Sequence, residues 1–211
     1  MGNRQGKQSQ LLNQVLLSGK LGDGSIVTQY EGTGSYITFN TINLDYLEYR
    51  KRVLEENGLW VSEVQYGPSG YIKGKLIPRI RTRVDSRVTE VGRMTVSEAI
   101  EGLDTTGLVQ LYLDDGTYIK RVPVAQLYVN SFTVEEVGLL IEKIYKHYPA
   151  KKCSIVWDKK RDGRKYPYLY IPKATFALFL EDIRKFLVDN KLESLYYKGG
   201  LPSTTIESAS E

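Results

Sequence analysis

The 211-residue chain has one cysteine and one histidine, which removes much of the chemistry that hydrolytic and metal-binding proteins use. The single Cys153 excludes an intramolecular disulfide and a cysteine-based zinc cluster. With His147 as the only histidine, a His-rich metal site or a Ser/His/Asp triad is disfavoured. Any hydrolytic chemistry must therefore come from carboxylates, hard metal ions, lysine or arginine. The cysteine usage also predicts a reducing, cytoplasmic setting.

Long hydrophobic runs are missing too. No segment approaches the ~20 apolar residues of a membrane span, and the polar N-terminus MGNRQGKQSQ lacks the apolar region of a signal peptide. The net charge of +4 is too small by itself to indicate nucleic acid. Basic residues nevertheless gather in two clusters, at 72–87 and 151–165, and such clusters predict surfaces for anions.

Two similar stretches are present, LLSGKLGDGSI at 16–26 and LVQLYLDDGTY at 108–118, and they place Asp115 92 positions after Asp23. Each runs from apolar, helix-like sequence into Asp-Gly. Glycine commonly follows a helix end, but an aspartate there lies at the negative pole of the helix dipole. Each carboxylate needs compensation, and a cation is the simplest candidate.

The similarity continues downstream of both stretches, which indicates an internal repeat. Each is followed by two strand-like segments, a helix, a second hairpin and a closing helix. Asn43 is a plausible N-cap for the first repeat's helix, and Thr133 with Glu136 forms a capping box in the second. The closing helices are expected at 85–91 and 173–190, and a short helix within 92–105 should join the repeats. The fold class is therefore α+β, with two pseudo-symmetric αββαββα halves at 1–95 and 96–211 and a disordered tail after 202.

Small residues on the first motif helix, Ser18, Gly19 and Gly22, give it a flat face against which a second helix can pack closely. Pairing the two motif helices would bring Asp23 and Asp115 side by side, where their charges repel. Hard divalent cations with oxygen ligands, Mg²⁺ above all, would relieve that repulsion. Taken singly, either Asp-Gly is more simply read as a turn or a capped helix end. The matched repeats favour the metal site.

These residues resemble the single-chain, two-motif LAGLIDADG homing endonucleases: LLSGKLGDGSI is similar to the first motif of the family, LVQLYLDDGTY to the second, and NSFTVEEVGLLI to the helix that follows it. The resemblance implies motif helices packed at the interface of the halves and antiparallel sheets forming a DNA-binding saddle. It implies a site-specific endonuclease that uses two or more Mg²⁺ ions, with Mn²⁺ as a substitute. A long asymmetric double-stranded DNA would be cut to leave short 3′ overhangs.

The resemblance also assigns roles to individual residues. Asp23 and Asp115 match the metal-binding acids, with the backbone carbonyls of Gly22 and Asp114 as auxiliary ligands. Lys198, in LYYKGGLPS, stands where the family carries a basic residue that positions the attacking water. Arg93 is the nearest basic residue for that role in the first half.

DNA contacts are expected on the sheets. Arg79, Arg81 and Arg83 alternate with apolar or small residues and should share one strand face, which suits guanine and phosphate contacts. A solvated outer strand or basic loop is the alternative. The other predicted contacts lie in the hairpins and basic turns, at Gln29, Tyr30, Tyr36, Thr38, Lys73, Lys75, Lys120, Arg121, Lys159, Lys160, Arg161, Arg164 and Lys165.

Two other functions fit the same fold. The first is an RNA maturase that binds its host intron, and the second is a DNA-binding protein that has lost cleavage. Both acids are present, which argues against the second, because unpaired carboxylates facing phosphate would only reduce affinity. The unequal halves predict a monomer with no obligate protein partner. The sequence does not identify the target DNA, the host, or whether the gene is in an intron, in an intein or free-standing.

Overall fold

A computed structural model describes residues 2–29, 32–68, 74–159 and 165–202, so the predicted disordered tail lies outside the described residues. The first repeat consists of α1 (Gly2–Leu21), β1 (Gly24–Thr28), β2 (Ser35–Asn40), α2 (Leu44–Glu56), β3 (Gln65–Pro68), β4 (Leu76–Arg81) and α3 (Ser86–Arg93). After α4 (Val96–Gly102), the second consists of α5 (Thr105–Asp115), β5 (Gly116–Ile119), β6 (Val124–Tyr128), α6 (Val134–His147), β7 (Ser154–Lys159), β8 (Lys165–Ile171) and α7 (Lys173–Asp189), followed by the 3-10 helix η2 (Glu193–Gly199).

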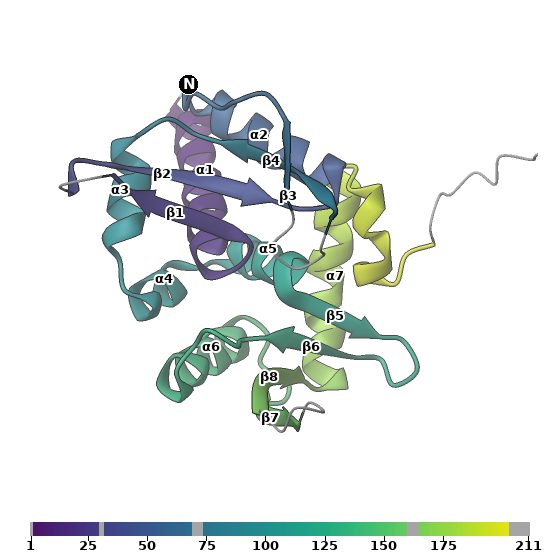
Figure 1. Ribbon diagram of the computed structural model, residues 1–211. Coiled ribbons are helices and arrows are strands. Elements are labelled where there is room, and N and C mark those ends of the chain that lie inside the picture. The colour runs from purple at the N-terminus through teal and green to yellow at the C-terminus, as the bar shows by residue number, and fades with distance from the viewer. Residues whose placement is uncertain (1, 30–31, 69–73, 160–164, 203–211) are drawn as a thin grey trace, which may run out of the picture.

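The α+β fold class is confirmed by two antiparallel sheets of four strands each. The first sheet has the order β1-β2-β4-β3 and the second has the same order, β5-β6-β8-β7. Figure 1 shows the first sheet above the second, with α5 between them. Because the repeated sequence pattern produces the same strand order twice, equivalent positions in the two sheets can be compared directly.

The helix ends follow the sequence signals with one exception. At the start of α6, the Thr133 hydroxyl accepts the Glu136 N–H and the Glu136 carboxylate accepts the Thr133 N–H, so the predicted capping box is confirmed. Asn43 does occupy the N-cap of α2, but its side chain makes no capping bond. It donates instead through Nδ2 to the Thr41 hydroxyl, 3.3 Å away, and the Tyr46 N–H in the first turn donates to the Asp45 carboxylate at 2.8 Å.

The predicted arginine strand is shorter than expected. β4 ends at Arg81, so Arg79 and Arg81 share one strand face, while Arg83 follows the strand and stacks its guanidinium 4.4 Å from the centre of the Trp60 ring. The prediction of three arginines on one strand is therefore wrong for Arg83. The alternation of inward and outward side chains nevertheless continues past β4: Thr82 is buried, where its hydroxyl accepts the Ile37 N–H, and Arg83 is exposed like Arg81.

The two motif helices, α1 and α5, contact each other in the centre of the molecule. Ser18 faces α5, where its hydroxyl lies 3.5 Å from the Gln110 side-chain oxygen. Gly22 also faces α5, and a Cβ there would lie 2.5 Å from an Asp114 carboxylate oxygen. Gly19 instead lies against the Phe39 ring of its own sheet. Two of the three small residues therefore allow the close helix approach, and the third allows packing of α1 on the first sheet.

Candidate active site at the paired helix ends

The C-terminal ends of α1 and α5 lie next to each other, at one cavity of about 790 Å³. The Asp23 backbone N–H, just beyond α1, donates to the Asp114 carboxylate at 3.3 Å. The cavity is lined by residues of both halves, among them Asp23, Arg79, Asp115, Tyr128 and Lys198. The arrangement therefore brings together Asp23 and Asp115, the two predicted metal-binding acids.

The two aspartates carry strongly perturbed pKa values. Burial, followed by the negative charge of Asp114, raises the pKa of Asp23 to about 6, although Asp23 still reaches solvent on one side. Burial, followed by the charges of Asp23 and Asp114, raises the pKa of the half-buried Asp115 to about 7. Without a bound cation, ionisation of both carboxyl groups at this site is therefore unfavourable.

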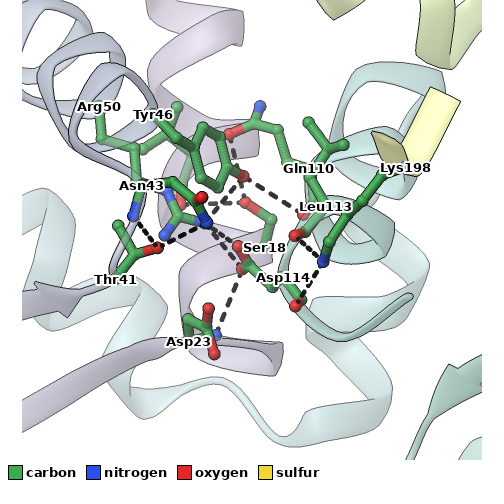
Figure 2. Close-up of polar contacts among 11 residues, drawn as sticks. Ser18, Asp23, Thr41, Asn43, Tyr46, Arg50, Gln110, Leu113, Asp114 and Lys198 are labelled. Carbon is green, nitrogen blue, oxygen red and sulfur yellow. Dashed lines mark hydrogen bonds and ion pairs between the residues drawn. The ribbon is translucent and has the colours of Figure 1, made fainter. Parts of the chain in front are cut away.

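Asp114 lies in the same motif as Asp115 but has a different environment. Its carboxylate accepts hydrogen bonds from Arg50 Nη2 at 2.6 and 2.7 Å, and both side chains are fully buried (Figure 2). Arg50 comes from α2 of the other half, and sequence reasoning missed it. Its local sequence, YRKRV, gives no sign of burial, because the partner that compensates its charge lies 64 positions away.

Lys198 is also brought to this site, on η2. It is 7% exposed, and its ammonium group donates to the backbone carbonyls of Leu113 and Asp114 at the end of α5. The Tyr112 hydroxyl donates to the Lys198 carbonyl at 3.1 Å and holds the segment against α5. Burial lowers the pKa of Lys198. A lysine at this helix end offsets the negative pole on which the two aspartates lie.

Arg93 lies at the exposed C-terminal end of α3. The cations that lower the pKa of Asp23 and Asp115 are Arg50 and Lys198. The catalytic role of Arg93 therefore stays a prediction. The buried cation of the first half that lowers the pKa of both carboxylates is Arg50.

The donor atoms at the cavity suit a hard cation. Asp23 and Asp115 supply carboxylate oxygens, and the carbonyls of Gly22 and Asp114 lie in the same backbone turns. Among the described residues, no three His, Cys, Asp or Glu side chains form a metal-binding cluster, and the Asp114 carboxylate is paired with Arg50. Two raised carboxylate pKa values with oxygen donors alone favour Mg²⁺, Mn²⁺ or Ca²⁺ over zinc.

The predicted DNA-contact residues of the first sheet share one face. Thr38 lies opposite Arg81, and Gln65, which is not among the predicted contacts, lies opposite Arg79. With Tyr36 they line a groove of about 280 Å³, and the Arg81 guanidinium lies 5.4 Å from the centre of the Tyr36 ring. Exposed positions near this face or in the turn between β5 and β6 hold Gln29, Lys75, Lys120 and Arg121.

The second basic cluster is only partly described. The backbones of Lys159 and Lys165 pair at the open end of β7 and β8. The remaining predicted contacts lie outside the described residues, namely Tyr30, Lys73, Lys160, Arg161 and Arg164. No described helix is long and apolar enough to cross a membrane.

Comparisons with known proteins agree with this geometry. The chain is similar in fold to the homing endonuclease I-WcaI bound to its DNA recognition sequence, with a TM-score of 0.73, 20% identity, and coverage of 92% of this chain and 87% of that one. It is also similar to I-DmoI in complex with DNA and Mn, with a TM-score of 0.53, 16% identity, and coverage of 85% and 95%. A third is the N-terminal LAGLIDADG domain of DUF199/WhiA, with a TM-score of 0.52, 16% identity, and coverage of 82% and 81%.

No curated protein sequence matches the chain. The family model of the LAGLIDADG DNA endonuclease family, however, matches residues 14–179, which include the C-terminal part of α1, all of α5 and both sheets. The chain belongs to the LAGLIDADG DNA endonuclease family.

Proposed function

We propose that the chain is a site-specific endonuclease that hydrolyses both strands of a long, asymmetric double-stranded DNA in a Mg²⁺-dependent reaction, leaving short 3′ overhangs. The pairing of Asp23 and Asp115 at one cavity carries this proposal, because each motif half contributes one carboxylate with a raised pKa. The carboxylates, with the Gly22 and Asp114 carbonyls, are proposed to hold two or more divalent cations, with Mn²⁺ as a substitute. When bound, such ions activate water and stabilise the leaving 3′ oxygen.

The protein's own residues would prepare this chemistry in three ways. Asp23 and Asp115 would hold the cations at the cavity that both residues line. Lys198 holds the end of α5 through the carbonyls of Leu113 and Asp114, and its positive charge faces a site where phosphate would lie. The cavity, shared by both halves, would admit the two scissile phosphates.

An asymmetric target follows from the unequal sheets. The first sheet presents Arg79 and Arg81 on the face that also carries Thr38. The corresponding face of the second sheet pairs Gln126 with Tyr170 and Tyr128 with Tyr168. Guanidinium groups favour guanine edges and phosphates, whereas tyrosines offer apolar and single hydrogen-bond contacts, so the half-sites should differ in sequence. We propose that residues 1–95 and 96–211 each bind one half-site.

We also propose that the chain acts as a monomer in a cytoplasmic setting. Both motif helices belong to one chain, and a second copy is therefore not needed to complete the acid pair.

The test is selection from a randomised long-duplex library with Mg²⁺ or Ca²⁺, using the wild type and Asp115→Asn. Recovery of one sequence cut only with Mg²⁺ and only by the wild type would establish the activity and its site. Enrichment by binding without cut ends would contradict cleavage. The absence of any enrichment would contradict DNA as the target, and binding to structured RNA would then be measured.

A further inference from the structure

The two halves differ at one buried contact next to the acids. The motif alignment places Gly22 opposite Asp114, and the helix N-caps place Arg50 of α2 opposite Leu140 of α6. Arg50 and Gly22 belong to the first half, and Asp114 and the buried Leu140 belong to the second, so the ion pair joins Arg50 of one half to Asp114 of the other. The two symmetry-related positions hold a glycine and a leucine, so the pseudo-symmetry does not repeat the ion pair.

Arg50 is fully buried and is held through its ring contacts and through Nη2, because Nε and Nη1 have no hydrogen-bond partner among the described residues. Its guanidinium lies between the rings of Phe39 and Tyr46, with centroid distances of 4.4 and 4.3 Å, and Nη2 also donates to the Tyr46 hydroxyl at 3.0 Å. Burying two charges costs free energy that an apolar pair would avoid. A costly pair next to two site carboxylates, at a contact that the pseudo-symmetry does not repeat, suggests a role beyond packing.

Asp114 links this arginine to Asp23. One Asp114 carboxylate oxygen accepts both Arg50 Nη2 and the Asp23 backbone N–H (Figure 2). The same oxygen occupies the space beside Gly22, where a Cβ would lie 2.5 Å from it. The turn that carries Asp23 therefore rests on the Asp114 carboxylate, which Arg50 fixes.

We propose that Arg50 is a positioning residue of the nuclease centre. It acts through Asp114 to hold the turn of Asp23 in place, and it keeps the Asp114 carboxylate from becoming a third acidic metal ligand. This inference rests on the proposed function, because it assigns Asp23 to metal binding. The two adjacent acids of the second motif then have different roles. Asp115 binds the metal, and Asp114 links Arg50 to the turn that carries Asp23.

The experiment compares Arg50→Leu/Asp114→Gly with the wild type. The double variant copies the residues that the chain itself carries at the equivalent positions, and it leaves no unpaired buried charge. Lys51→Met is the control, because Lys51 also makes an ion pair from α2, with Glu63, but away from the cavity. Three quantities are measured: thermal unfolding, Tb³⁺ or Mn²⁺ affinity of the DNA-free protein, and single-turnover cleavage with DNA affinity in Ca²⁺.

We expect the double variant to fold and to bind DNA as the wild type does, with metal affinity and cleavage reduced ~10–100-fold, as is typical when a group that orients a metal ligand is lost. The control should change none of these. A folded double variant with wild-type metal affinity and cleavage would overturn the proposal. The Arg50–Asp114 ion pair of the wild type would then have only a structural role.

If the double variant does not fold, Arg50→Lys decides the question. Its ammonium keeps the charge but does not reproduce the planar guanidinium between the two rings, so we expect weaker metal binding in a folded protein. Unchanged metal affinity in Arg50→Lys would overturn the proposal. A wild type that binds metal but cuts no DNA would contradict the proposed function alone, since the ratio of metal affinities still tests Arg50. A wild type that binds no metal would contradict both.

Discussion

Neutralising Asp115 should stabilise the metal-free protein while abolishing cleavage. Asp115 shares its helix end with Asp23, and burial together with the charges of Asp23 and Asp114 raises its pKa from 3.8 to about 7. A raised carboxyl pKa in the folded state means that folding favours the protonated form. The wild type therefore loses stability as the pH rises from about 4 to about 7, and it has lost all of this contribution at pH 8. Asp115→Asn carries no charge at any pH and avoids the loss.

The size of the effect follows from the shift. Three pKa units correspond to about 4 kcal/mol at 1.36 kcal/mol per unit. Asp115 is only half-buried, so screening by solvent reduces this, and we expect about 2 kcal/mol. For a chain of this size, 1 kcal/mol shifts the midpoint of thermal unfolding by roughly 2–4 °C. Asp115→Asn should therefore unfold roughly 4–8 °C higher than the wild type at pH 8.

The assay is thermal unfolding of both proteins in EDTA at pH 5 and pH 8, repeated with Mg²⁺ or Ca²⁺. The difference should be large at pH 8 and clearly smaller at pH 5, which lies only about one unit above the ordinary pKa of 3.8 at which the loss begins. Divalent cation should raise the wild-type midpoint more than that of the variant. Equal midpoints in EDTA at pH 8, or a less stable variant, would refute the electrostatic reasoning.

Three further predictions concern cleavage and DNA binding. Lys198→Met removes the donor to the Leu113 and Asp114 carbonyls, and single-turnover assays should show cleavage reduced ~10–100-fold with DNA affinity retained; unchanged cleavage would dismiss the role. Arg79→Ala should cost about 1–3 kcal/mol of DNA binding and relax specificity at one position, which binding assays on single-base target variants would measure. Gly67→Ala would place a Cβ 2.2 Å from the Arg79 guanidinium and displace it, so it should weaken binding as Arg79→Ala does with little change in stability. Wild-type binding by Gly67→Ala would show that the observed position of the guanidinium is unimportant.

The architecture could be predicted because its signals are local and occur twice. Repeated Asp-Gly ends, hairpins at matching positions and the Thr133–Glu136 capping box each depend on residues close in sequence. The errors arise where two local preferences compete. Asn43 occupies the N-cap but bonds to Thr41, and β4 ends at Arg81, before Arg83, which contacts the Trp60 ring instead. Helix and strand propensities predict neither outcome, because both depend on which side chains lie close to Asn43 and to Arg83 in the folded protein.

The candidate site was predicted in part, for a related reason. Asp23 and Asp115 could be paired because the repeat implies a pseudo-twofold axis, and packing the two motif helices against each other at that axis brings their equivalent ends together. Arg50 and Asp114 break that symmetry, so the repeat contains no information about their contact. Arg50 reads as one of three basic residues on a helix surface, and only the fold shows that it is buried between Phe39 and Tyr46.

The departure from symmetry explains why the second motif has two acids where the first has one. A glycine at position 22 leaves space beside α1, and that space is filled by the Asp114 carboxylate from α5. Filling it with a carboxylate adds a third negative charge next to Asp23 and Asp115, which raises the pKa of both. Only a buried cation on the same oxygens makes this tolerable, and Arg50 supplies it at 2.6 and 2.7 Å. Gly22, Asp114 and Arg50 therefore form one interdependent unit, and none of the three can be replaced without changing the environment of the others.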